Sequence, residues 1–256
     1  MDVLGVGISA VNPRTALAEV TGWMRMDRRN SAPRKRRTPK YVCFTGVHGV
    51  MECQDDPDLR AIHNSSAMTA PDGMPMVWAC RWAGFKAIER VSGPDLMPLI
   101  CAAGVAAGWR HYFYGGAAGV ADLLAEALSD RFPGMRVVGT HTPPFRPLTD
   151  REEDRVTAAI NDARPDCVWV GLSTPKQERW MADMAPRLDV AALFGVGAAF
   201  DFLTGRRRRA PVWMQRTGLE WLHRSAADPL RLAPRYFRNN PRFVAHVLRR
   251  PPRRMG

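Results

Sequence analysis

The sequence predicts an α/β protein of the Rossmann-like class, with a mostly parallel sheet, helices on both faces and an arginine-rich helical C-terminal appendage. Between residues 41 and 196, short apolar segments typical of strands alternate with segments of helical period. Three apolar segments end in glycine-containing turns, at 115–116, 171–177 and 195–201. Since ligands bind at the carboxyl ends of strands in such sheets, we expect these turns to converge on one edge.

The same patterns give the order of the elements. Strands are expected at 3–8, 41–45, 111–114, 135–139, 166–171 and 190–196. Helices are expected at 15–26, 47–53, from 57 onward, 74–82, 94–107, 118–132, 149–163 and 175–186. Asp56-Pro57 is a typical N-cap followed by a first-turn proline, and Asp72-Gly73 marks a turn before the helix at 74–82. The basic segment 27–40 is expected to be a loop.

Charge divides the chain at residue 205. The last 51 residues contain fourteen arginines and two acidic residues, and so carry the whole net charge of +12. We therefore predict a catalytic core at 1–205 and a basic appendage at 206–256, built of helical pieces broken by Pro211, Pro229, Pro234 and Pro241. Such an asymmetry favours an anionic partner for the appendage, either a membrane surface or a nucleic acid.

Composition also limits the class of protein. Five scattered cysteines without a Cys-x-x-Cys pair favour reduced thiols in the cytosol over a disulfide or zinc framework. The first twenty residues lack the pattern of a secretory signal, and no apolar run approaches the roughly 20 residues that span a bilayer. If the protein meets a membrane, we expect it to lie on the surface.

Two glycine turns are candidate nucleotide-binding sites. Gly115 and Gly116 separate a strand from a helix whose N-terminal N–H groups would suit a diphosphate, although a tight turn between strand and helix is the alternative. After Gly171, residues 173–175 have a structural explanation, since Ser173 or Thr174 can cap the following helix and Pro175 fits its first turn. This does not account for Lys176 and Gln177 at a strand's carboxyl edge, where a base or phosphate would lie; a solvated helix residue is the alternative for Gln177.

Several motifs together resemble one family. They are Pro71-Asp72-Gly73, Arg90-Val-x-Gly-x-Asp-Leu, Gly171 with Pro-Lys-Gln-Glu178, Gly195-Val-Gly-x-x-Phe-Asp201, and Gly218-Leu-Glu-Trp-Leu-x-Arg224 followed by Arg231 and Arg235. The chain resembles the WecG/TagA/CpsF glycosyltransferases from residue 3 to residue 236, with one extra residue before Pro175. The resemblance implies a Rossmann-like enzyme that transfers a sugar from a nucleotide donor to a lipid-linked acceptor.

The resemblance also implies roles. Asp72 corresponds to the family's proposed base, although a turn aspartate that caps the helix at 74–82 is the alternative reading. Arg90 would contact a donor phosphate or sugar, and Asp201 would bind substrate or pair with Arg206–Arg209. Three arginines would reach the acceptor's diphosphate, namely Arg224, Arg231 and Arg235.

Position 45 departs from the family pattern. The usual Thr-x-Asn falls on Phe44 and Gly46, so we place Thr45 in the catalytic set with a shifted register, with His48 as the alternative source of polar contacts.

The expected reaction is transfer of a hexose-type sugar, such as N-acetylmannosamine, from a UDP-sugar to a polyprenyl-diphosphate-linked sugar, with inversion. It belongs to cell-surface polysaccharide biosynthesis. We expect no cofactor and no metal, with arginines and backbone amides neutralising the leaving diphosphate. We also expect a peripheral enzyme on an anionic membrane surface, at the inner face of the cytoplasmic membrane. A homo-oligomer is compatible with the sequence.

Two rival functions remain at this level. One is a nucleotide-binding module whose basic tail binds nucleic acid, which would show salt-sensitive binding without UDP binding. The other is a metal-dependent glycosyltransferase that uses Asp56 and Asp58 as an Asp-x-Asp pair. We interpret Asp56 instead as a helix cap.

Overall fold

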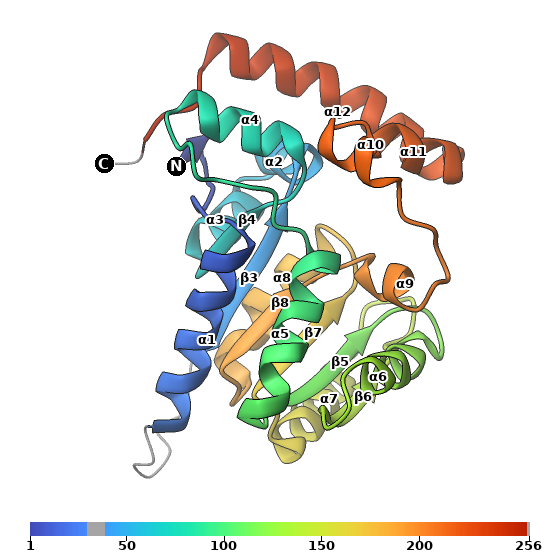
Figure 1. Cartoon of the computed structure of the whole chain (residues 1–256). Helices are drawn as coiled ribbons and strands as arrows, with labels where there is room; N and C mark the ends of the chain where they lie inside the picture. The colour runs from blue at the N-terminus through green and yellow to red at the C-terminus, as the bar shows by residue number, and fades with distance from the viewer. Residues whose placement is uncertain (30–38, 255–256) are drawn as a thin grey trace. The chain divides into compact units, whose positions relative to one another are not determined.

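The computed structural model describes residues 1–29 and 39–254 (Figure 1), so residues 30–38 of the predicted basic loop lie outside the described residues. Six strands form one sheet in the order β4-β3-β8-β7-β5-β6, and a separate pair joins β1 to β2. The pairs β5·β6, β5·β7 and β7·β8 are parallel. The strands are β1 Asp2–Val3, β2 Val6–Gly7, β3 Lys40–Thr45, β4 Met68–Pro71, β5 Arg110–Gly115, β6 Arg136–His141, β7 Cys167–Gly171 and β8 Ala192–Gly195. The predicted fold class is confirmed.

From β2 to β8, helices connect successive strands, as the parallel part of the sheet requires. Those before the C-terminal region are α1 Pro13–Arg29, α2 Val47–Asp55, α3 Pro57–Ser65, α4 Met74–Trp82, α5 Gly93–Ala107, α6 Val120–Arg131, α7 Asp150–Ala163, α8 Lys176–Met184 with the 3₁₀ turn η1 Ala185–Arg187, and α9 Ala199–Leu203. Figure 1 shows α5 and α6 in front of the sheet and α7 and α8 behind it.

The chain forms two compact units. Unit 1 contains Met1–Arg14, Cys43–Ser92 and Arg208–Gly256. Unit 2 contains Thr15–Val42 and Gly93–Arg207. Strand β3 contributes residues to both, since its first three residues belong to unit 2 and its last three to unit 1. The described C-terminal residues therefore share a compact unit with the N-terminus.

One strand prediction is wrong and one strand was missed. Residues 3–8 are not one strand but an antiparallel hairpin, because Leu4 and Gly5 both adopt positive φ (54° and 84°) and turn the chain between β1 and β2. Strand β4 was not predicted at all. Its four residues are all buried, so they lack the polar alternation by which a half-buried strand is identified.

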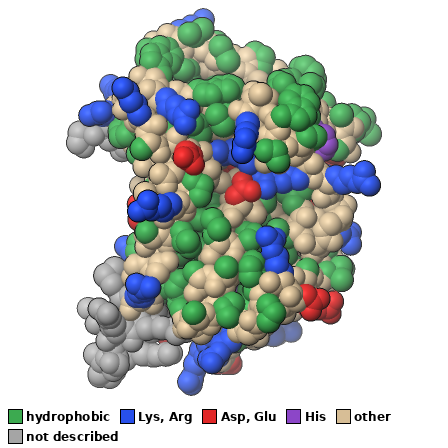
Figure 2. Space-filling model, viewed as in Figure 1, with side chains coloured by type: hydrophobic (Ala, Val, Ile, Leu, Met, Phe, Trp, Pro, Cys, Tyr) green, Lys and Arg blue, Asp and Glu red, His purple; other side chains and the backbone are tan. Residues whose placement is uncertain are grey.

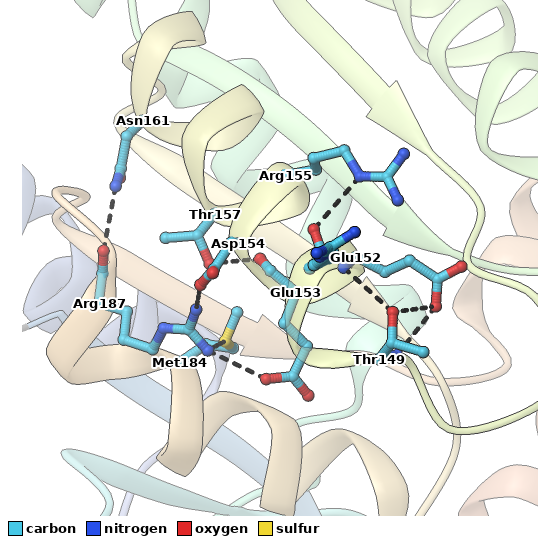
Figure 3. A network of polar contacts seen from close by, with 10 residues as sticks. Thr149, Glu152, Glu153, Asp154, Arg155, Thr157, Asn161, Met184 and Arg187 are labelled. Carbon is cyan, nitrogen blue, oxygen red and sulfur yellow. Dashed lines mark hydrogen bonds and ion pairs between the residues drawn. The ribbon is translucent and has the colours of Figure 1, made fainter.

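Unit 2 is centred on β7, in which four of the five residues are buried. Trp169 stacks on Phe194 of β8 with ring centroids 4.4 Å apart. On the side of α7, a polar network ties this helix to η1 (Figure 3). Arg187 pairs with Glu153 at 3.0 Å and with Asp154 at 2.6 Å, and its carbonyl accepts from Asn161 at 3.0 Å.

The C-terminal region is helical and packed. Its helices are α10 Val212–Arg216, α11 Glu220–Ala227 and α12 Pro229–Arg249. The prediction that Pro234 and Pro241 break the helix is wrong, because α12 continues through both for 21 residues. In unit 1, Phe243 and Val247 join the hydrophobic cluster formed with Val50 and Met51 of α2. The region therefore completes a core, and removing everything after Gly205 would expose it.

Candidate active site

In unit 2, the glycine turns meet at neighbouring strand ends. Gly115 lies opposite Gly171 in the β5·β7 register, and Gly116 N–H donates to the Gly171 carbonyl at 2.9 Å. Gly115 has φ of 117°, and a Cβ there would lie 2.7 Å from the Gly171 oxygen, so both the backbone angle and the close approach require glycine. The predicted convergence of Gly115, Gly116 and Gly171 is thus observed.

A cavity of about 620 Å³ opens beside this turn. It is lined by Gly116, Ala117, Ala118, Gly119, Asp122, Thr140, His141, Thr142, Pro143, Pro144 and Phe145. One wall is therefore the N-terminus of α6, which offers backbone N–H donors and the positive end of the helix dipole. The rest of the lining comes from β6 and the segment after it, and includes residues that the sequence did not single out. The sequence pattern that could have indicated these residues is a strand that ends in Thr-His-Thr before Pro-Pro.

Asp122 and Thr142 add side-chain polarity near this cavity. The Asp122 carboxylate accepts from the Thr140 hydroxyl at 2.5 Å, and the Thr142 hydroxyl donates to the Gly115 carbonyl at 3.2 Å. Asp122 lies in the first turn of α6, so a carboxylate that can accept from hydroxyl groups stands beside the N–H groups that could hold an anion.

Gln177 is buried, with 3% of its surface exposed, so the solvated-helix alternative is wrong. Its Nε2 donates to the Gly195 carbonyl at 2.7 Å and to Glu178 at 3.0 Å, which ties the start of α8 to the end of β8. Thr174 also donates to Glu178, at 2.9 Å. Among the described residues the Gln177 Oε1 has no hydrogen-bond partner. It faces Gly197, where a Cβ would lie 3.3 Å away.

Lys176 and Asp201 are more exposed. The Lys176 ammonium lies 5.0 Å from the centre of the Phe145 ring, which brings its charge to the rim of the cavity. Asp201 lies 3.8 Å from Arg206 and 3.6 Å from Arg207, so it makes the arginine pairs that were its alternative role. These are surface pairs and contribute little to stability.

In unit 1, Thr45 and Asp72 lie against each other at the ends of β3 and β4. Asp72 N–H donates to the Thr45 carbonyl at 3.0 Å. A Cβ on Gly46 would lie 2.6 Å from the Asp72 carbonyl oxygen. The close approach leaves no room for a side chain at position 46. Thr45 is buried, and its Oγ1 has no partner among the described residues.

Asp72 is half-buried and precedes α4. The N-cap of that helix is Gly73, with φ of 101°, and not Asp72. Asp56, by contrast, caps α3 as predicted, since its carboxylate accepts from Leu59 N–H at 2.9 Å. Within residues 1–29 and 39–254 no group of three or more His, Cys, Asp or Glu side chains could hold a metal ion.

Arg90 is hydrogen-bonded to residues of the C-terminal region. Its guanidinium donates to Glu220 at 2.8 Å and to Gln215 at 2.6 Å. The following residue, Val91, donates its N–H to the Pro71 carbonyl at 2.9 Å, which holds this segment beside the strand end that carries Asp72.

Two of the three arginines that were predicted to reach the acceptor's diphosphate influence the pKa of His48. Burial lowers the pKa of His48 to about 3, and the charges of Arg235 of α12 and Arg224 of α11 contribute to the same shift. The ring of His48 contacts Asn239 at 3.1 Å and Glu52 at 3.4 Å. Among the described residues the Arg235 Nε is buried without a partner. Because cations near a neutral imidazole create a positive potential, this cluster is suited to an anion.

Arg231 differs from these two arginines. It is exposed and pairs with Asp228 at 2.9 Å.

Fold and site define an α/β protein with polar groups at the carboxyl ends of a parallel sheet. The model of the glycosyl transferase WecG/TagA/CpsF family matches residues 1–255. The chain belongs to this family and is a glycosyltransferase, as the sequence motifs predicted.

Two curated relatives come from Bacillus spizizenii and Bacillus subtilis. The first is 28% identical over 198 residues, covering 77% of this chain and 74% of the relative. The second is 27% identical over 176 residues, covering 69% and 67%. Both are named N-acetylglucosaminyldiphosphoundecaprenol N-acetyl-beta-D-mannosaminyltransferase.

Proposed function

We propose that this enzyme transfers a hexose-type sugar from a UDP-sugar to a polyprenyl-diphosphate-linked acceptor sugar, with inversion, in cell-surface polysaccharide biosynthesis. Membership of the family over residues 1–255 is the observation that carries this proposal. The names of the two Bacillus relatives support a lipid-diphosphate-linked N-acetylglucosamine as the acceptor and N-acetylmannosamine as a candidate donor sugar.

Asp72 acts as the general base. Its carboxylate takes the proton from the acceptor hydroxyl while that oxygen attacks the anomeric carbon, and the bond to UDP breaks with its electrons passing to the diphosphate. The half-buried position of Asp72 beside the Thr45 strand end supports this role, because a base must reach both substrate and solvent. Thr45 would orient Asp72, because its carbonyl accepts the Asp72 N–H.

Unit 2 binds the donor nucleotide. The N–H groups at the start of α6 would hold the diphosphate, and Asp122 would accept from ribose hydroxyls. Gln177 Oε1 would accept a further hydrogen bond from the donor, since its amide nitrogen is already used by Gly195 and Glu178. Lys176 and backbone amides would stabilise charge on the departing UDP, so we propose a reaction that needs no metal.

Unit 1 binds the acceptor. The cationic cluster of Arg224 and Arg235 beside neutral His48 supports a role in holding the acceptor's diphosphate. The described residues contain no helix long and apolar enough to cross a membrane. We propose that the enzyme reaches its lipid acceptor by binding an anionic membrane surface, at the inner face of the cytoplasmic membrane, through its arginine-rich C-terminal region.

The test combines binding and transfer. Calorimetry with UDP, ADP and GDP should give selective binding of UDP, weakened at least tenfold in Gln177→Ala. Thr174→Val is the matched control, because it removes another hydrogen bond of the same network and leaves the Gln177 oxygen in place. In transfer assays with a lipid-diphosphate acceptor, Asp72→Asn should lower kcat by about 10²–10⁴ with UDP binding unchanged.

Three outcomes would contradict the proposal. Asp58→Asn should be as active as the wild type, and EDTA should not affect transfer; loss of activity in either case would favour the metal-dependent alternative. Salt-sensitive DNA binding without any UDP binding would favour a nucleic-acid-binding module instead.

A further inference from the structure

Unit 1 exposes an unusual set of large apolar side chains on four helices. Trp82 of α4 is 58% exposed, Trp213 of α10 is 60% exposed and Phe237 of α12 is 64% exposed. Others are Trp78, Val212, Leu222, Leu230, Val244 and Leu248. Figure 2 shows hydrophobic side chains interspersed with Lys and Arg over the region of α4 and α10–α12. Isolated exposed apolar residues are ordinary, but a concentration of tryptophans with arginines is not.

These helices form one continuous surface. Gly218, between α10 and α11, lies against α4, since a Cβ on it would lie 2.7 Å from the Trp78 ring and 3.5 Å from Met74. From α11, Trp221 reaches α12 and meets Phe237 edge to face with ring centroids 5.9 Å apart. Helix α4, which belongs to the sequence before the basic region, is therefore part of the same face.

Helix α12 has two apolar stripes. The inner stripe is buried: Leu232, Tyr236, Phe243 and Val247, with Asn239 among them. The outer stripe recurs every three or four residues and is exposed: Leu230, Pro234, Phe237, Pro241, Val244 and Leu248. Arginines flank it, and α4, α10 and α12 contain no acidic residue. An apolar stripe between cationic flanks matches an anionic bilayer surface.

The prolines distinguish lipid from a second copy of the chain. Pro234 and Pro241 have no N–H, so the helix cannot supply the usual donor to the carbonyls of Leu230 and Phe237. Both carbonyls belong to residues of the outer stripe. A dry helix–helix interface or the hydrocarbon core would leave them unsatisfied, which is costly. At the depth of the lipid headgroups, water satisfies them.

We propose that α4, α10, α11 and the outer stripe of α12 form one lipid-binding face, which lies flat at headgroup depth on anionic phospholipid with Trp82 and Trp213 as interfacial anchors. The proposal rests on the proposed function and extends it, because it adds α4 to the membrane contact and sets the depth of α12.

The test uses the full chain with vesicles of phosphatidylglycerol and phosphatidylcholine. Trp82→Ser with Trp213→Ser should lower the vesicle partition coefficient about tenfold or more, because both rings leave the interface. Leu123→Ser on α6 is the matched control: Leu123 is 46% exposed in unit 2, and its loss should not change binding. Brominated lipids should quench wild-type tryptophan fluorescence most when the bromine lies near the headgroup, and this quenching should be weaker in the double variant, in which Trp78 remains on the face.

Several results would overturn the proposal. They are unchanged partition of the double variant, equal binding to pure phosphatidylcholine, strongest quenching from bromine at the bilayer centre, or a dimer in solution that the tryptophan substitutions dissociate. Transfer to a short-chain, water-soluble acceptor separates this proposal from the proposed function. The double variant should retain that transfer. If the proposed function is wrong, the wild type should show no transfer to this acceptor either.

Discussion

At the scale of residues, the position of the candidate base Asp72 depends on the absence of a side chain at Gly46. Gly46 follows Thr45, and the space that its Cβ would occupy is 2.6 Å from the Asp72 carbonyl oxygen. Gly46 has φ of −108°, which any residue adopts, so the constraint is close approach and not backbone angle. The distance between β3 and the segment of Asp72 is thereby set by position 46.

Gly46→Ala should therefore separate Thr45 from Asp72. We expect a loss of about 1–3 kcal/mol in the free energy of unfolding and a lower kcat, because the added methyl has to displace backbone. Gly22→Ala in α1 is the control, since nothing lies within 4 Å of its Cβ. It should raise stability by about 0.5–1 kcal/mol, as alanine does in a helix. Chemical denaturation measures both, and an unaffected Gly46→Ala would refute the argument.

Residue patterns predicted some of the site and could not predict the rest. The glycines at 115, 116 and 171 were predictable, because strand–glycine–helix patterns determine where a parallel sheet presents its turns. The burial of Gln177 was not, since it depends on the Gly195 carbonyl, 18 residues away in sequence. The cationic environment of His48 likewise depends on helices almost two hundred residues later in the chain.

At the scale of elements, α12 shows the limit of local rules. Two internal prolines predicted breaks, yet the helix continues because its inner stripe is buried on unit 1. Tertiary packing therefore outweighs a local cost of about 3 kcal/mol for each proline. The helices predicted at 47–53 and 74–82 are observed at 47–55 and 74–82, and neither has a proline beyond its first turn.

Pro241→Ala should consequently stabilise unit 1. Alanine restores an N–H donor to the Phe237 carbonyl, which stabilises the folded state. Loss of the proline also makes the unfolded chain less restricted, which offsets part of this effect. The free energy of unfolding should therefore rise by about 2 kcal/mol. Pro229→Ala is the matched control, because Pro229 occupies the first turn of α12, where a missing N–H costs nothing. Thermal unfolding compares the two. If Pro241→Ala lowered Tm, the proline would have a structural role beyond the one assigned here.

At the scale of the whole molecule, each unit holds a histidine that folding keeps neutral. Burial lowers the pKa of His111 in unit 2 to about 4, while burial and two arginines lower that of His48 in unit 1 to about 3. His111 accepts from the Trp169 indole at 3.1 Å, which a protonated ring could not do. Both side chains bind a proton in the unfolded chain at a higher pH than in the folded one.

The sign of the pH dependence follows. The unfolded state, with a histidine pKa near 6.5, gains protons first as pH falls, so stability is lost from about pH 6.5 downward until the folded pKa is reached. Between pH 7 and pH 5 each histidine should cost about 2 kcal/mol of unfolding free energy. Urea titrations of wild type and His48→Gln measure this, and the variant should lose about 2 kcal/mol less over that range. Parallel pH profiles would mean that His48 becomes charged in the folded protein, and the anion site argued for Arg224 and Arg235 would then contain a third cation.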